Sequence, residues 1–280
     1  NAICPDINGS GKLKLDKAEN PLFTLAEKEV VPLNIELNEE KILLLSGPNA
    51  GGKTVVLKSL GLYALMAQCG LFIPAYKAQF PIYTKFMADI GDRQSIEDDL
   101  STFSAHIQNL ATIVEQANEN TLILLDELGT GTDPDAGAAL SRAIMESLIQ
   151  KNCTVIATTH LGSLKVWASD EKGIINGGMI FNSEALAPTY ELQLGTPGAS
   201  YALEISKRMG LSDDIINRSK ELVGDGSVNL ENILGQLEKE RLAAESLRVD
   251  LQHREKKLEQ IETQIFSKEN EINKAHKKAK

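Results

Sequence analysis

The sequence has few cysteines and no long apolar run, and each absence excludes a class of protein. Cys4, Cys69 and Cys153 are scattered and odd in number, which predicts free thiols in a reducing compartment and not a disulfide framework. Neither a C-x-x-C pair nor a paired histidine spacing is present, so a zinc site has no support. No apolar run approaches the roughly 20 residues of a membrane span. We therefore expect a cytoplasmic protein without a membrane partner.

The sequence also lacks an initiating methionine and an excess of positive charge. It begins at an asparagine, without a signal-peptide pattern, which favours a fragment of a longer protein. The formal net charge is −10, so the chain as a whole is no natural binder of polyanions. If the parent protein grips nucleic acid, we expect most of that surface to lie outside this chain. The 280 residues suffice for one large domain and an appendage.

Apolar strand-like runs alternate with helical patterns along most of the chain, which predicts an α/β fold with a mostly parallel central sheet flanked by helices. The predicted strands are 41–46, 84–90, 121–126, 153–158 and 188–194, and the predicted helices are 53–68, 102–118, 136–150, 199–208 and 213–223. Residues 1–20 are polar and lysine-rich and are predicted to be a linker from an upstream segment. Residues 21–37 are predicted to form edge strands that feed the sheet.

A seven-residue repeat follows a glycine-containing break at 224–228 and continues to the end of the chain. Its first apolar position holds Leu230, Leu237, Ala244, Leu251, Leu258, Ile265, Ile272 and Ala279. Its second holds Ile233, Leu247, Ile261 and Ala275, interrupted by Glu240, Arg254 and Lys268. A repeat sustained this long predicts a C-terminal coiled coil over 229–280. The alternative is one long amphipathic helix packed on the body.

The strand predicted at 41–46 leads into the pattern G-x-x-x-x-G-K-T. Its residues are Gly47, Pro48, Asn49, Ala50, Gly51, Gly52, Lys53 and Thr54. A strand, a glycine-rich turn and a helix in this order form a phosphate loop, whose backbone N–H groups and helix N-terminus attract phosphate. In such a loop Lys53 contacts the β- and γ-phosphates and Thr54 offers its hydroxyl to Mg²⁺. The pattern therefore predicts binding of a nucleoside triphosphate such as ATP, with an ordinary glycine turn as the alternative.

Two acidic residues, Asp126 and Glu127, end the apolar run 121–125. A buried parallel strand that ends in carboxylates places them at the carboxyl edge of the sheet, beside the phosphate loop. There Asp126 is suited to hold Mg²⁺ and Glu127 to polarise the attacking water. The alternative is a pair of acids that merely opens a loop.

His160 follows the strand predicted at 153–158. An imidazole at that edge is suited to bond the γ-phosphate or the attacking water, although a lone histidine is more often structural. His106 lies inside a helical pattern, which leaves surface and functional roles equally open. Ser101 is a good helix N-cap; a phosphate contact supplied to a partner subunit is a second role for it.

Together these stretches resemble the ATPase domain of the MutS superfamily, and more closely its MutS2 branch. The residues that carry the resemblance are 47–54, 89–96, 100–104, 125–133, 158–161, 188–190 and 195–202. The resemblance covers about residues 20–223, and the heptad segment fits the coiled region that follows this domain in MutS2 proteins.

The resemblance implies an ABC-type ATPase fold that works as a homodimer, with two composite sites for ATP and Mg²⁺ at the interface. By position, Ser101 would contact the partner's γ-phosphate, and Asp133 would lie in the loop that follows the metal-binding strand. Tyr190 is a candidate for packing on adenine. The superfamily commonly has a His-Pro where this chain has Asn20-Pro21, so no base contact is carried over from that stretch.

The implied function is an ATP-hydrolysing motor domain of a DNA-binding protein that acts in recombination or repair. The segments that embrace DNA would precede residue 1, and the nuclease module of MutS2 proteins would follow residue 280. One alternative is an ATPase associated with the ribosome or RNA in quality control, and another is a nucleotide-binding dimer scaffold with little turnover. A transporter or chromosome-organising ATPase is disfavoured, because 100–104 reads Leu-Ser-Thr-Phe-Ser in place of a Leu-Ser-Gly-Gly-Gln signature.

Overall fold

The computed structural model describes most residues up to 222 and a few positions after it. The described residues are 2–8, 11–48, 51–91, 99–182, 185, 187–199, 201–219, 221–222, 240, 248, 251, 254, 255, 257 and 258. The chain divides into two units, Asn1–Leu234 and Gly235–Lys280, and every helix and strand named below belongs to the first. Within the described residues, no helix combines the length and the apolar character that crossing a bilayer requires.

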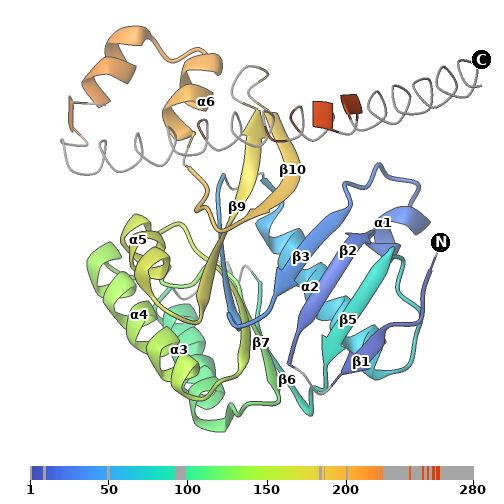
Figure 1. The fold of residues 1–280 in the computed structure, drawn as a ribbon. Helices are drawn as coiled ribbons and strands as arrows, with labels where there is room; N and C mark the ends of the chain where they lie inside the picture. Colours follow the sequence, from blue (N-terminus) through green and yellow to red (C-terminus); the bar gives the residue numbers. More distant parts are fainter. Residues whose placement is uncertain are drawn as a thin grey trace, which may run out of the picture. The chain divides into compact units, whose positions relative to one another are not determined.

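A six-stranded sheet forms the centre of the first unit (Figure 1). Its strands are β4 Ile42–Ser46, β6 Lys85–Asp89, β7 Thr121–Leu125, β8 Thr154–Thr158, β9 Ile174–Asn182 and β10 Ala187–Leu194. The order across the sheet is β10-β9-β4-β8-β7-β6. β10 is antiparallel to β9, and the other neighbouring pairs are parallel. The mostly parallel sheet is thus confirmed, although β9 has no counterpart among the predicted strands.

The strand order brings three loops together at one edge of the sheet. β8 lies between β4 and β7, and the three strands are parallel. Their carboxyl ends therefore meet at the same edge, where parallel α/β sheets commonly bind ligands. The segments that leave these ends are the phosphate loop after β4, Thr159 and His160 after β8, and Asp126 and Glu127 after β7.

Helices cover both faces of this sheet (Figure 1). They are α2 Lys53–Gln68 on one face, and α3 Asp99–Gln116, α4 Pro134–Gln150 and α5 Gly162–Asp170 on the other. Side chains of β4 alternate between the two cores, because successive residues of a strand point to opposite faces. Leu43 and Leu45 pack in the core that contains α2, whereas Ile42 and Leu44 pack with α3, α4 and α5. Burial on both faces explains why β4 is apolar from Ile42 to Leu45.

Two further helices follow the sheet along the chain. They are α6 Ala202–Arg208 and a helix at 213–219. The predicted helices at 53–68, 102–118, 136–150 and 199–208 are confirmed, with ends that shift by up to three residues. The predicted helix at 213–223 is confirmed over 213–219. α5 was absent from the predicted elements.

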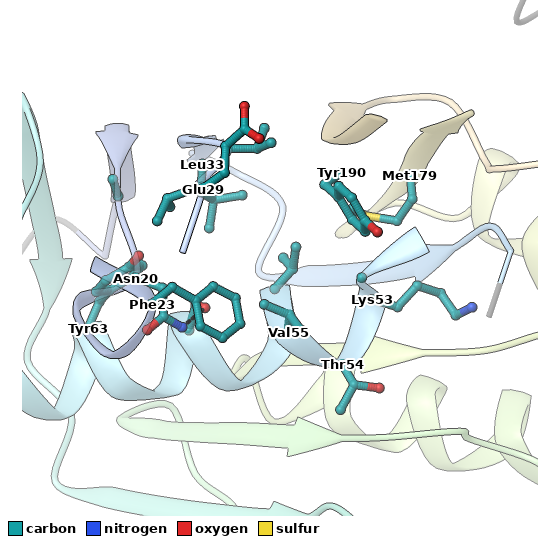
Figure 2. A pocket seen from close by; sticks show the side chains of 16 residues that line it. Asn20, Phe23, Glu29, Leu33, Lys53, Thr54, Val55, Tyr63, Met179 and Tyr190 are labelled. Carbon is teal, nitrogen blue, oxygen red and sulfur yellow. Dashed lines mark hydrogen bonds between the residues drawn. The ribbon is translucent and has the colours of Figure 1, made fainter. Parts of the chain in front are cut away.

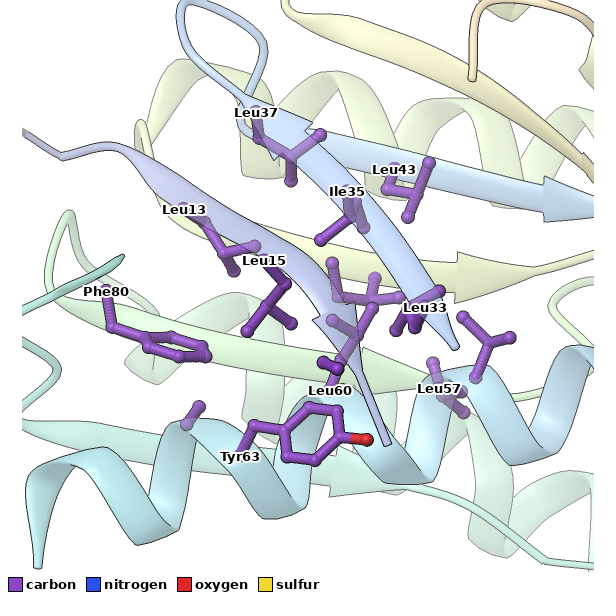
Figure 3. Packing of buried hydrophobic residues seen from close by; sticks show 14 of the residues in the cluster. Leu13, Leu15, Leu33, Ile35, Leu37, Leu43, Leu57, Leu60, Tyr63 and Phe80 are labelled. Carbon is purple, nitrogen blue, oxygen red and sulfur yellow. The ribbon is translucent and has the colours of Figure 1, made fainter. Parts of the chain in front are cut away.

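A second, four-stranded sheet packs on α2. Its strands are β1 Asp6–Asn8, β2 Leu13–Ala18, β3 Leu33–Leu37 and β5 Lys77–Pro81, in the order β1-β5-β2-β3. Figure 3 shows leucines of β2 and β3 meeting Leu57, Leu60 and Tyr63 of α2. The prediction that residues 1–20 form a linker is therefore wrong for β2, because Leu13 and Leu15 are buried in this core.

A short helix also replaces part of the predicted edge strands at 21–37. α1 Pro21–Leu25 begins at Asn20, whose Oδ1 accepts a hydrogen bond from the N–H of Leu22 (3.0 Å). Asparagine at the N-cap and proline at the first helical position are a strong helix start. The strand prediction is thus wrong for 21–25. β3 is a strand at a sheet edge as predicted, but it belongs to the four-stranded sheet and not to the central one.

The predicted break at 224–228 lies outside the described residues. The same holds for the predicted coiled coil at 229–280, apart from the isolated positions given above. The coiled coil stays a prediction.

Candidate functional site

The phosphate loop leaves β4 at Ser46 and enters α2 at Lys53. Gly47 and Gly52 have φ angles of 126° and 93°, which are left-handed values that glycine adopts without strain. Gly52 is the N-cap of α2 and makes no side-chain cap bond, so the first N–H groups of the helix are not capped by that residue. Asn49 and Ala50 lie outside the described residues. The described part of the loop has the backbone geometry that phosphate binding requires.

Lys53 lies inside the loop. Its side chain is buried, with 4% exposure, and Nζ donates hydrogen bonds to the carbonyl oxygens of Gly47 (2.7 Å) and Pro48 (3.0 Å). Burial is the main cause that lowers the pKa of Lys53 from 10.5 to about 8, and the nearby charge of Lys165 adds to it. The carboxylates of Glu127 and Asp126 act in the opposite direction. The ammonium group is thus destabilised until a nearby anion favours its charge.

Asp126 meets the start of α2. The Thr54 hydroxyl lies 3.3 Å from Asp126 Oδ1, to which it donates a hydrogen bond. The same oxygen accepts a shorter bond, 2.7 Å, from the Thr158 hydroxyl at the end of β8. A hydroxyl and a carboxylate side by side are the oxygen ligands that Mg²⁺ prefers.

Thr54 and Asp126 would supply two oxygen ligands to such an ion. Among the described residues, no group of three or more His, Cys, Asp or Glu side chains is arranged to hold a metal. Mg²⁺ typically keeps several waters and binds through one or two protein ligands plus phosphate oxygens. The Thr54 and Asp126 pair fits that pattern of coordination.

Glu127 and His160 approach each other at the same edge. Glu127 Oε1 lies 3.4 Å from His160 Nε2, and both side chains remain partly exposed. Glu127 has φ of 53°, a left-handed value that is unusual for a residue other than glycine. Its N–H donates to the Thr158 hydroxyl (2.7 Å), and its carbonyl accepts from the Thr130 hydroxyl (2.8 Å). Two threonine hydroxyls therefore hold the strained backbone that presents this carboxylate.

A cavity of about 510 Å³ opens beside the phosphate loop. Figure 2 shows Tyr190 and Met179 on the side next to Lys53, with Phe23 and Val55 along the cavity. The other lining residues are Ala18, Asn20, Glu29, Val30, Val31, Leu33, Gly52, Lys53, Thr54, Val56, Ser59 and Tyr63. The walls are largely apolar, with few polar groups, as is usual in small-molecule sites. The volume and its place next to the loop suit a nucleoside.

Asn20 builds one end of this cavity. Its Nδ2 donates to the Ser59 hydroxyl of α2 (2.7 Å), while its Oδ1 caps α1. Both ends of the amide are thus engaged within the protein. Asn20 therefore positions α1, and with it Phe23, over the cavity.

Ser101 and Asp133 lie on helices. The backbone of Ser101 belongs to the first turns of α3, and its side chain lies outside the described residues. Asp133 is the N-cap of α4, because its Oδ1 accepts from the N–H groups of Asp135 and Ala136 (both 3.1 Å). The cap accounts for Asp133 locally. The contact of Ser101 with a partner stays a prediction.

Several residues of the site are absent from the sequence-based predictions. Thr158 bridges Asp126 and Glu127; the sequence indicates that it ends a predicted strand, but not that this strand lies beside the phosphate loop. Phe23 and Met179 line the cavity, yet both lie in ordinary amphipathic stretches that carry no local signal.

Comparison with known proteins places this geometry in a family. The family described as MutS domain V matches residues 43–225. A protein named Endonuclease MutS2 from Ruminiclostridium cellulolyticum is 49% identical over 247 residues, or 88% of this chain and 31% of that protein. Namesakes from Acetivibrio thermocellus and Clostridium botulinum are 46% and 42% identical over 85% and 93% of the chain. The chain thus spans about a third of the length of these curated relatives, and it belongs to the MutS domain V family.

Proposed function

We propose that this chain is the ATP-binding and ATP-hydrolysing part of a MutS2-like, DNA-associated protein. The observation that carries the proposal is the convergence of Lys53, Thr54, Asp126, Glu127 and His160 at one edge of the sheet. In the sequence, 72 positions separate Thr54 from Asp126 and 33 separate Glu127 from His160, and the strand order brings the three segments together. Membership of the MutS domain V family supports the same function.

The phosphate loop binds the triphosphate. Lys53 Nζ is satisfied by two backbone carbonyls, and an incoming phosphate oxygen competes with them by offering full negative charge. The N–H groups of the first turn of α2 add favourable partial charge. Burial therefore destabilises the ammonium group in the ligand-free loop, and the negative charge of the bound phosphate stabilises it.

Thr54 and Asp126 would hold Mg²⁺. When bound, this ion neutralises charge on the phosphate oxygens and so assists transfer of the terminal phosphoryl group. Asp126 is kept in place for this role by the Thr158 hydroxyl (2.7 Å). Oriented oxygen ligands of this kind reduce the entropy lost on binding.

Glu127 positions and polarises the attacking water. A carboxylate accepts a hydrogen bond from a water molecule, and His160, close to Glu127, orients the carboxylate or contacts the terminal phosphate. Because Thr158 bonds both the Asp126 carboxylate and the N–H of Glu127, it ties the metal-binding carboxylate to the backbone that presents Glu127. Binding and hydrolysis therefore use adjacent parts of one rigid edge.

The apolar cavity takes the nucleoside. Tyr190 and Phe23 supply aromatic area for the base, and stacking on aromatic rings is worth about 1 to 3 kcal/mol per base. Tyr190 matches the position expected from the family to pack on adenine. Phe23, Val30 and Val31 add apolar surface for the base. They follow Asn20-Pro21, the pair that stands in place of the superfamily's His-Pro.

The family pattern further suggests a homodimer through the ATPase face, with Ser101 of one subunit at the other's terminal phosphate. ATP would join two subunits, and hydrolysis would separate them, which would control engagement of DNA by segments outside this chain. A ribosome- or RNA-associated role is the alternative for the parent protein. The site in this chain serves either role.

Two substitutions test the assignment. Lys53→Ala should abolish binding of ATP, measured by calorimetry, because a buried charge-assisted contact is lost. Glu127→Ala should bind Mg-ATP with near-normal affinity and lose hydrolysis. Lys58→Ala is a matched control, because Lys58 is an exposed lysine of the same helix and should behave as the unsubstituted chain. Tight ATP binding by the Lys53 variant would refute the site.

A concentration series separates the proposed dimer from a one-subunit enzyme. Hydrolysis per subunit should rise with protein concentration if the site is completed by a partner, and Ser101→Ala should then lower it. Hydrolysis that is absent at every concentration, with ATP still bound, would favour the alternative of a nucleotide-binding scaffold.

A further inference from the structure

A buried lysine outside the phosphate loop points toward that loop. Lys165 lies on α5 and is 5% exposed. Its Nζ donates a hydrogen bond to the carbonyl oxygen of Gly198 (3.1 Å). Burying an ammonium group opposes folding unless the surroundings compensate, so a buried lysine in this place is a candidate for a functional role.

Gly198 is in backbone contact with the first residue of the phosphate loop. Its N–H donates to the Ser46 hydroxyl (2.8 Å), which is completely buried. A Cβ atom at Gly198 would lie 2.7 Å from Gly47 Cα and 2.7 Å from the Ser46 carbonyl oxygen. These separations leave no space for a side chain. Segment 195–199 therefore forms the support on which the loop rests.

The backbone of Lys165 is held by a hydrogen bond from β9. Its own carbonyl accepts a hydrogen bond from Asn176 Nδ2 of β9 (3.0 Å), and the same nitrogen donates to Ser169 Oγ (2.9 Å). The lysine thus spans from α5 and β9 to the support at Gly198. The Lys165 ammonium group thus adds a hydrogen bond to segment 195–199 at Gly198, beside the one that the Gly195 N–H donates to the Asn176 carbonyl oxygen of β9 (2.7 Å).

The charge of Lys165 is also felt inside the loop. After burial itself, Lys165 is the largest cause that lowers the pKa of Lys53. Two ammonium groups at one edge repel each other, and a polyphosphate with several negative charges relieves this repulsion more than a monophosphate does.

We propose that Lys165 is a positioning residue for the polyphosphate: it holds segment 195–199 against Gly47 and adds positive charge beneath the phosphate loop. This inference rests on the proposed function, because it assumes that the loop binds ATP. It assigns to α5 a part in nucleotide affinity that no residue of the phosphate-loop pattern supplies.

The test compares the affinities for ATP and AMP of the whole chain and of its variants, measured by calorimetry. Lys165→Met removes the charge and the donor with little change in size, and should weaken ATP binding about tenfold, the effect of a lost charged hydrogen bond. AMP binding should change by less than about twofold, because fewer charges are involved. Lys165→Arg keeps the charge and the donor and should restore most of the ATP affinity.

Two further variants provide a control and an independent check. Lys85→Met removes a lysine that also donates to a backbone carbonyl, that of Gln116 (3.1 Å), at the opposite end of the β6 strand from the site; it should bind as the unsubstituted chain does. Gly198→Ala disturbs the same support from the other partner and should also weaken ATP binding about tenfold. Combined with Lys165→Met, it should add little, because both act through one contact.

The outcomes separate this inference from the proposed function. ATP binding by Lys165→Met at normal strength, or equal losses for ATP and AMP, would overturn the inference and leave the function intact. If Lys165→Met lacks a cooperative unfolding transition, Gly198→Ala and Lys165→Arg decide by the same criteria. Failure of the unsubstituted chain to bind ATP would instead refute the proposed function.

Discussion

Raising the pH above about 8 should weaken ATP binding, because Lys53 then loses its proton in the ligand-free protein. Its pKa is lowered to about 8, first by burial and then by Lys165. A bound polyphosphate favours the charged form, so binding above this pH requires uptake of a proton. By linkage, the affinity should fall about tenfold between about pH 7 and about pH 9, with uptake of about half a proton at about pH 8.

Unfolding does not account for such a loss. A folded-state pKa of about 8 lies below the ordinary value of 10.5, so the unfolded state binds more protons between these two values. The contribution of Lys53 to stability therefore rises with pH across that window. As the pH rises above about 8, ATP binding should therefore weaken while the buried lysine destabilises the fold less.

Calorimetry measures both the affinity for ATP and the number of protons taken up on binding. Titrations in two buffers of different ionisation enthalpy give the number of protons taken up, and the phosphates of ATP are themselves ionised well below this range, at a pKa of about 6. Adenosine, which lacks the charges that Lys53 meets, is the control and should bind without pH dependence. An ATP affinity that stays constant from about pH 7 to about pH 9 would show that the lysine keeps its proton, and would refute the reasoning.

Three other substitutions test separate parts of the site and its support. Tyr190→Ala should weaken ATP binding about tenfold through lost stacking while leaving tripolyphosphate binding unchanged, and Tyr190→Phe should bind normally; equal affinities by calorimetry would contradict the cavity assignment. Thr158→Val leaves Asp126 and the N–H of Glu127 without a shared partner, so the hydrolysis rate in a phosphate-release assay should fall at least about tenfold, with less effect on ATP affinity. Gly137→Ala places a Cβ 2.3 Å from a backbone carbonyl of the loop after β7 and should destabilise the fold by about 2 kcal/mol in urea unfolding; unchanged stability would show that this loop yields easily.

Local sequence signals predicted the parts of the site that depend on a few neighbouring residues. The phosphate loop combines glycine spacing, Lys53 and Thr54 within eight positions, and the apolar run before it has the composition of a strand buried on both faces. Asp126 and Glu127 stand out because two charges end a run of buried residues. In both places the residues with reactive side chains lie directly after the end of a strand, so one stretch of sequence indicates both.

The parts that were missed depend on contacts between distant segments. The cavity brings Phe23 of α1, Val55 of α2 and Met179 of β9 together with Tyr190 of β10. The family resemblance pointed to Tyr190, but no periodicity in the other three segments indicates that they meet it. The double role of Thr158 likewise follows from β8 lying between β4 and β7, an order that the sequence pattern does not specify.

The error in β2 has a different cause. Leucine and charged residues alternate at the start of this strand, and Leu13 and Leu15 are buried while Lys14 between them is half-buried. The lysine content of 1–20 suggested a linker, although period-two alternation is the stronger signal. In β2 the alternation of leucine with charged residues therefore indicates the structure better than the lysine content does.

The close approach of Gly198 to Gly47 has a consequence for the proposed site. A methyl group does not fit between the two backbones, so segment 195–199 lies directly against the start of the phosphate loop. Tyr190, at the cavity, lies in β10, which ends at Leu194 just before that segment. One short stretch, residues 190–198, thus reaches both the cavity and the phosphate loop, so in the proposed site a substitution there should affect contacts to the base and to the phosphates together.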